Sequence, residues 1–121
     1  MKKLIIFAAL LVSLTSCLDG IKLDKHKVIL DGNEQDVTIK ATTSIFDIWV
    51  DCDESVSYDK EVGAKKASGS WFETSVSTAS SKEVRVAVSK NESGAERKIQ
   101  IFLSNSMGNN DSCTITQKAL K

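Results

Sequence analysis

The stretch Val84–Ser104, VRVAVSKNESGAERKIQIFLS, decides the fold class of this 121-residue chain. Apolar and polar residues alternate in both of its halves, and the two apolar faces consist of Val84, Val86 and Val88, and of Ile99, Ile101 and Leu103. This period of two is typical of half-buried β-strands. The residues between the halves, Asn91–Gly94, are turn formers, so the stretch predicts two strands joined by a turn.

Five further segments show a strand pattern: residues 26–30, 36–41, 46–52, 71–77 and 113–117. In residues 46–52 the alternation places Phe46, Ile48, Val50 and Cys52 on one apolar face. Residues 59–67 are expected to form a loop. Seven short strands without a helical period predict an all-β protein, an immunoglobulin-like two-sheet β-sandwich after an N-terminal signal segment.

Residues 1–16 have the composition of a secretory signal peptide. Lys2 and Lys3 provide a positive start, and the apolar run 4–12 is too short to span a bilayer as a helix. The next residues, Leu14-Thr15-Ser16-Cys17, resemble the bacterial lipobox, which implies cleavage before Cys17 and acylation of its thiol. A signal peptide without lipidation is the alternative.

The lipobox resemblance implies a protein of the cell envelope that is held on the membrane through its lipid anchor alone. The residue after the cysteine, Leu18, is typical of lipoproteins sent to the outer membrane. Residues 17–25 are expected to be the lipidated cysteine and a linker, and residues 26–121 the β-sandwich domain. Loss of Lys2 and Lys3 from sixteen basic residues leaves fourteen against sixteen acidic ones, which argues against nucleic acid as a partner.

The second half of the chain resembles the BACON domain (Bacteroidetes-Associated Carbohydrate-binding Often N-terminal). The resemblance spans roughly residues 22–119. It rests on the order of four motifs, which are Trp71-Phe72, Asn91, the Arg97–Leu103 strand and Thr114-Ile115-Thr116-Gln117. It implies a non-catalytic glycan-binding module. The family usually accompanies catalytic domains, so a solitary copy leaves a structural or protein-partner-binding role in an envelope complex as the alternative.

Trp49 is the leading candidate for contact with a sugar. Asp47, Trp49 and Asp51 share one face of their predicted strand, so the ring is expected to stack on a sugar while the carboxylates accept bonds from its hydroxyl groups. Trp71 is the second candidate. The alternative is that the strand phase is shifted and the tryptophans are structural, as the BACON resemblance implies.

Cys52 and Cys113 remain after removal of the signal peptide and lipidation of Cys17. Both are in phase with the apolar faces of their strands, and an envelope compartment permits a disulfide. A bond between them would close a loop of about 60 residues. Two buried free thiols are the alternative.

The sequence contains no pattern of an enzyme, and neither a cofactor nor a metal is expected. No nucleophile elbow, zinc signature or phosphate loop is present. Asp51, Asp53 and Glu54 lack the spacing of a calcium loop and predict a solvated acidic turn. The single histidine, His26, is expected at the surface.

Overall fold

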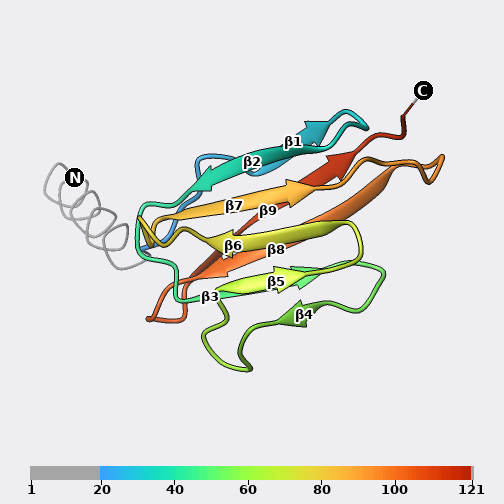
Figure 1. Cartoon of the computed structure of the whole chain (residues 1–121). Coiled ribbons are helices and arrows are strands. Elements are labelled where there is room, and N and C mark those ends of the chain that lie inside the picture. Colours follow the sequence, from blue (N-terminus) through green and yellow to red (C-terminus); the bar gives the residue numbers. More distant parts are fainter. Residues whose placement is uncertain (1–19, 121) are drawn as a thin grey trace, which may run out of the picture.

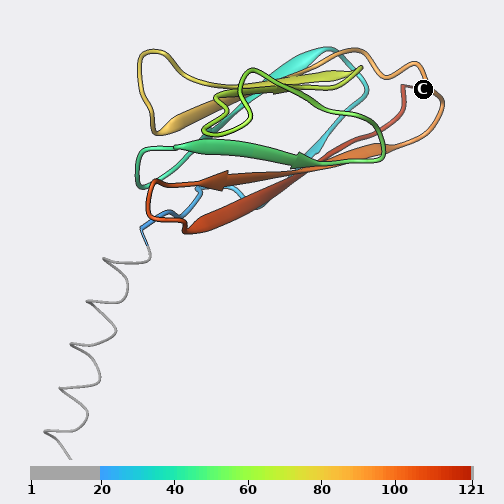
Figure 2. The same ribbon diagram turned by 90° about the horizontal axis from the view of Figure 1, so that it is seen from below.

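A computed structural model describes residues 20–120 of the chain. The predicted signal peptide and Cys17 lie outside the described residues. Within them, nine strands form two sheets that pack face to face as a β-sandwich, as Figure 2 shows from the side. The predicted fold class is thus confirmed.

One sheet has four strands in the order β1-β9-β8-β3, and the other has five in the order β2-β7-β6-β5-β4 (Figure 1). The strand bounds are β1 Lys27–Leu30, β2 Gln35–Lys40, β3 Asp47–Asp51, β4 Ser57–Tyr58, β5 Lys66–Ser68, β6 Phe72–Val76, β7 Glu83–Val88, β8 Arg97–Ser104 and β9 Asn110–Gln117. All neighbouring strands are antiparallel except β1 and β9, which run parallel. The chain therefore passes between the sheets from β1 to β2, from β2 to β3, from β3 to β4 and from β7 to β8.

The core lies between the sheets and consists of the apolar faces that the alternation predicts. The β7 and β8 faces are fully enclosed, with Val84, Val86, Ile101 and Leu103 at 0% exposure. Burial of side chains of this size stabilises a fold by roughly 1.5–3 kcal/mol each. One phase was predicted wrongly: Phe46 is 43% exposed, because β3 starts one residue later and Phe46 belongs to the preceding loop.

The predicted linker 17–25 is wrong over its described part. Ile21 and Leu23 are buried in the core, and Leu23 forms a β-bridge with Ala41. The Asp111 carboxylate accepts a 2.9 Å hydrogen bond from the Leu23 amide, which fixes this segment to β9. The packed domain therefore extends further toward the N-terminus than His26 and includes Ile21 and Leu23.

The structure has two more strands than the seven predicted. Both β4 and β5 are short, and they flank the predicted loop, which the structure confirms over residues 59–65. The Tyr58 side chain of β4 covers the free edge of β3. Its hydroxyl accepts a hydrogen bond from the Val50 amide and donates one to the Val50 carbonyl. Ile48 donates to the Ala64 carbonyl on the same edge. Pairing of another chain along β3 is thereby obstructed.

Candidate functional site

The exposed aromatic feature of the molecule is Trp49 on the outer face of the four-stranded sheet. Its side chain is 52% exposed, so the predicted outward phase is correct. Phe102 of β8 is its partner across the sheet, with ring centroids 5.2 Å apart and planes tilted by 51°. Such a pair holds the indole ring in a defined orientation.

Polar side chains continue this surface across the sheet. Strand register places Ser112 beside Phe102, and places Gln100 beside both Asp51 and Thr114. Gln100 donates a 3.2 Å hydrogen bond to the Ser112 hydroxyl, which holds the amide over the sheet. We call this surface the Trp49 face and define it by Trp49, Asp51, Gln100, Phe102, Ser112 and Thr114.

The two carboxylates that flank Trp49 have different environments. Asp47 accepts a 2.9 Å hydrogen bond from the Ala64 amide and helps to fix the loop that follows β4. Asp51 is exposed, and no protein partner of its carboxylate is found among the described residues. Of the two predicted sugar-binding acids, Asp51 is therefore the one whose oxygens are open to a ligand.

Two grooves adjoin the Trp49 face. The first, with a volume of about 400 Å³, lies between β3 and the β4–β5 loop and includes Trp49 and Tyr58 in its lining. The second, of about 670 Å³, is bordered by Asp51, the turn that follows it and the start of β8. Acidic side chains outnumber basic ones around the second groove, which is lined by Asp51, Asp53, Glu54 and Glu96 against Arg97 and Lys98.

Trp71, the second residue predicted to contact a sugar, is largely buried, although it contributes to the lining of the second groove. Its side chain is 9% exposed and packs edge-on against Phe72. The Arg97 guanidinium lies 4.5 Å from the ring centroid and covers one face of the indole. Arg97 therefore occupies one face of the indole on which a sugar could otherwise stack.

Arg97 and Gln117 extend this contact into a partly buried polar cluster. Arg97 donates to the Gln117 side-chain oxygen at 2.9 Å and to the carbonyls of Ser89 and Lys90. Gln117 is 0% exposed, and its amide donates in turn to the carbonyls of Asn33 and Ser89. Burial lowers the pKa of Arg97, while Glu54 opposes this shift.

Asn91 completes the cluster at the same end of the sandwich. It is fully buried, and its amide donates to the carbonyls of Ala95, Gln117 and Lys118. Four residues that carry the BACON resemblance thus lie together and connect three loops. They are Trp71, Asn91, Arg97 and Gln117. These contacts give the motifs a structural role in holding this end of the sandwich together.

The predicted disulfide is not formed, since Cys52 and Cys113 are both free thiols. Cys52 directly follows β3, Cys113 lies in β9, and β8 runs between these strands. Two strand spacings amount to about 10 Å, whereas the α-carbons of a disulfide lie about 4.4–6.8 Å apart. Burial raises the pKa of the Cys113 thiol to about 11.

The remaining polar candidates lie at the surface. His26 is exposed as predicted, and its Nε2 is 2.8 Å from the Asp111 carboxylate. Asp53 and Glu54 lie in an exposed turn, and hydrogen bonds from Ser70 lower the pKa of Glu54. Within residues 20–120, no group of three or more His, Cys, Asp or Glu side chains is arranged to hold a metal ion. The same residues include no helix that is long and apolar enough to cross a membrane.

The described residues thus form a two-sheet β-sandwich domain with an exposed aromatic pair on one outer face. No family model matches the chain, and no curated protein matches its sequence. Solved structures are similar: an NMR structure of a protein from Bacteroides thetaiotaomicron has a TM-score of 0.58 and 17% identity over 84% of this chain and 89% of that one. A Bacteroides ovatus GH5 xyloglucanase, solved with a XXXG heptasaccharide, has a TM-score of 0.51 and 15% identity. That match covers 84% of this chain and 19% of the xyloglucanase. At these identities the likeness concerns the fold.

Phe102, Gln100, Ser112 and Thr114 are the residues of the Trp49 face that the sequence did not predict. All four occupy the outward phase of β8 or β9, so alternation alone marks them as exposed. What the sequence lacks is the order and register of the strands, which brings Phe102 opposite Trp49. The strand pairing therefore assembles the surface from three separate segments.

Proposed function

We propose that this protein is a non-catalytic envelope lipoprotein whose Trp49 face binds glycan. One observation carries the proposal, which is the half-exposed, oriented Trp49–Phe102 pair on the outer face of the four-stranded sheet. An indole face buries the C–H face of a sugar ring, and the surrounding hydroxyl, amide and carboxylate groups match sugar hydroxyls. The BACON resemblance and the lipobox at Cys17 support the same role.

The closest chemical match among ligand classes is a neutral polysaccharide. Asp51 is the only charged member of the Trp49 face, and the adjoining second groove is acidic, so an anionic chain would be repelled. A neutral chain lying across β3, β8 and β9 would meet the aromatic pair first and then Gln100 and Thr114. The similar fold within part of a xyloglucanase accords with this ligand class.

A glycan-array screen of the purified mature chain, followed by calorimetry on any ligand found, tests the proposal. Trp49→Ala is expected to weaken binding at least about tenfold, equivalent to about 1.4 kcal/mol, while the circular dichroism spectrum stays unchanged. Ile29→Ala is the matched control, because Ile29 is 57% exposed on the same sheet face but lies in β1, away from the aromatic pair. Equal binding by both variants would contradict a glycan site at Trp49.

A second role, docking on a protein of an envelope complex, is favoured by the edge of the same sheet. β1 is an edge strand whose outer side pairs with no other strand of the described chain, and it exposes Ile29. Such an edge can accept an extended segment of a partner. Replacement of Ile29 by lysine would prevent this association and leave glycan binding intact, so pull-down experiments with this variant separate the two roles.

A further inference from the structure

The loops at one end of the sandwich form a surface adjacent to the predicted lipid anchor. We call this the anchor end and define it by residues 20–26, 41–46, 59–65, 77–82 and 105–109. The described chain begins here, at the left of Figure 1, where Gly20 lies close to Asn105 of the turn that joins β8 and β9. The opposite loops, residues 31–34, 52–56, 69–71, 89–96 and 118–120, form the far end.

The start of the domain is held firmly against the anchor end. Gly20 adopts φ +72°, and a Cβ built on it would come within 2.4 Å of the Asn105 side chain. The Gly20 carbonyl accepts a 2.7 Å hydrogen bond from the Thr42 hydroxyl. Only three peptide units separate Cys17 from Gly20, a reach of about 10 Å. A lipid on Cys17 would therefore hold the anchor end within about one Debye length of the bilayer surface.

The charge of the described loops differs between the two ends. The anchor end carries five lysines and three acidic residues, which are Lys22, Lys25, Lys60, Lys65 and Lys82 with Asp24, Asp59 and Glu61. The far end carries two lysines and six acidic residues, which are Lys90 and Lys118 with Asp31, Glu34, Asp53, Glu54, Glu92 and Glu96. An anionic surface attracts the first end and repels the second.

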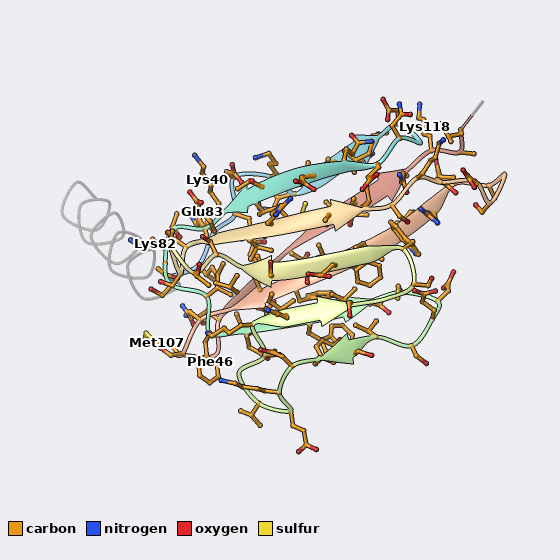
Figure 3. All side chains as sticks on the ribbon, in the orientation of Figure 1. Lys40, Phe46, Lys82, Glu83, Met107 and Lys118 are labelled. Carbon is orange, nitrogen blue, oxygen red and sulfur yellow. The ribbon has the colours of Figure 1, made fainter. Side chains whose placement is uncertain are left out.

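The same end exposes large apolar side chains. Met107 is 69% exposed at the tip of the β8–β9 turn, Val62 is 77% exposed, and Phe46 is 43% exposed. Figure 3 shows Met107, Phe46 and Lys82 at this end of the molecule and Lys118 at the opposite one. Exposed apolar side chains that share one end of the domain with an excess of lysines are the composition of a surface that enters the headgroup region of a membrane.

We infer that the anchor end docks directly on an anionic bilayer, with Met107 and Phe46 at headgroup depth and Lys22 and Lys82 near lipid phosphates. This inference rests on the proposed lipidation of Cys17. Docking would incline the strands steeply to the membrane plane. The far end would then point away from the membrane. The Trp49 face, on the side of the sandwich, would then stay clear of the membrane and accessible to a polysaccharide.

Lysine footprinting on vesicles tests the orientation. The mature chain from Cys17, carrying Cys52→Ser, is coupled through the Cys17 thiol to maleimide lipid; the buried Cys113 does not compete. Vesicles contain phosphatidylethanolamine and phosphatidylglycerol, with phosphatidylcholine vesicles for comparison. Amine labelling of Lys22 and Lys82 is expected to slow about fivefold on the anionic vesicles, whereas Lys90 and Lys118 are labelled at an unchanged rate.

Two variants, one at each end of the domain, test which end contacts the membrane. Lys82→Glu, combined with Met107→Ser, is expected to restore rapid labelling of Lys22 on the anionic vesicles. Lys118→Glu, which makes the same charge change at the far end, is expected to leave the protection of Lys22 intact. Equal labelling of both ends in the coupled chain would overturn the docking.

The anchor itself is tested separately by mass spectrometry of the native protein from membrane fractions. An unmodified Cys17 there would refute the lipidation, and with it the biological setting of the docking, whatever the coupled chain shows. An acylated Cys17 together with equal labelling of the two ends would leave the lipoprotein proposal standing and refute the orientation alone.

Discussion

The two tryptophans of this chain lie in contrasting surroundings. Trp71 is 9% exposed and is held between Phe72 and the Arg97 guanidinium at the far end of the sandwich. Trp49 is 52% exposed and touches one aromatic neighbour on an outer sheet face. A buried aromatic side chain with satisfied polar neighbours contributes to stability, whereas an exposed and oriented one is available to a ligand. The contrast distinguishes a residue that stabilises the fold from a residue that is available to bind a ligand.

The largest expected effect is the loss of the enclosed ring. Trp71→Ala should lower the free energy of unfolding by about 3–5 kcal/mol, because it leaves a cavity and removes the ring on which the Arg97 guanidinium packs. Trp49→Ala should cost less than about 1.5 kcal/mol, the range of a surface aromatic pair. Urea unfolding followed by circular dichroism measures both. Similar losses in the two variants would refute the distinction drawn between them.

A smaller effect is expected where Tyr58 closes the edge of the strand that carries Trp49. Tyr58→Phe retains the ring but removes the acceptor of the Val50 amide, and should destabilise the protein by about 1–2 kcal/mol. Hydrogen exchange of the Val50 amide should accelerate, while that of Ile48, bonded to Ala64, changes little. An unchanged exchange rate at Val50 would contradict this role of the hydroxyl.

Asp111 connects the first described residues to β9, and its effect depends on pH. Burial alone would raise its pKa, but hydrogen bonds from the Leu23 amide, His26 and the Ser112 amide lower it below the ordinary value of 3.8. Because the folded-state pKa is lowered, the stabilisation is present above pH 3.8 and is lost as pH falls through the lowered value.

Asp111→Asn should therefore destabilise the protein by about 1 kcal/mol at neutral pH and flatten its acid unfolding below pH 3.8. Thermal unfolding across this pH range measures the difference. A variant whose acid unfolding parallels that of the wild type would show that other carboxylates dominate. Asp24, Asp31 and Asp59 also have a lowered pKa and provide the background.

The smallest effect concerns the two thiols, which should react differently without changing stability. In a chain with Cys17 replaced by serine, one thiol is expected to react in the native state and two after denaturation. The reactive group is Cys52, which is half-buried, since Cys113 is 0% exposed and burial raises its pKa to about 11. Mass spectrometry of the alkylated protein assigns the sites. If both cysteines stay unreactive in denaturant, they are joined by a disulfide and the assignment of free thiols is wrong.

Strand phase was predictable because it depends on neighbours in sequence. Alternation placed Val86 and Ile101 inside and Trp49 outside, and the structure confirms all three. The error at Phe46 arose because the strand begins only at Asp47, so alternation does not fix the direction of the preceding side chain. The segment around Leu23 was taken for a linker because its short apolar pattern needs Ala41 and Asp111 to form structure.

The pairing of the strands and the clustering of residues distant in sequence, in contrast, could not be predicted from the sequence. Nothing in the order of residues states that β8 separates β3 from β9, and this separation is what keeps Cys52 and Cys113 apart. The same arrangement brings Phe102 opposite Trp49, and it gathers Asn91, Arg97 and Gln117 around Trp71. Each contact joins residues distant along the chain, so it exists only when both sheets are formed.

The sequence by itself determined that this protein is a β-sandwich, which side chains of its strands face the core, and the prediction of a lipid anchor at Cys17. These properties follow from local periodicity and local motifs. The tertiary structure decided which tryptophan is enclosed, which acid beside Trp49 is free, and where Met107 and Lys82 lie relative to Gly20. Those outcomes depend on strand order and register, which are set by the packing of the whole sandwich rather than by any one segment.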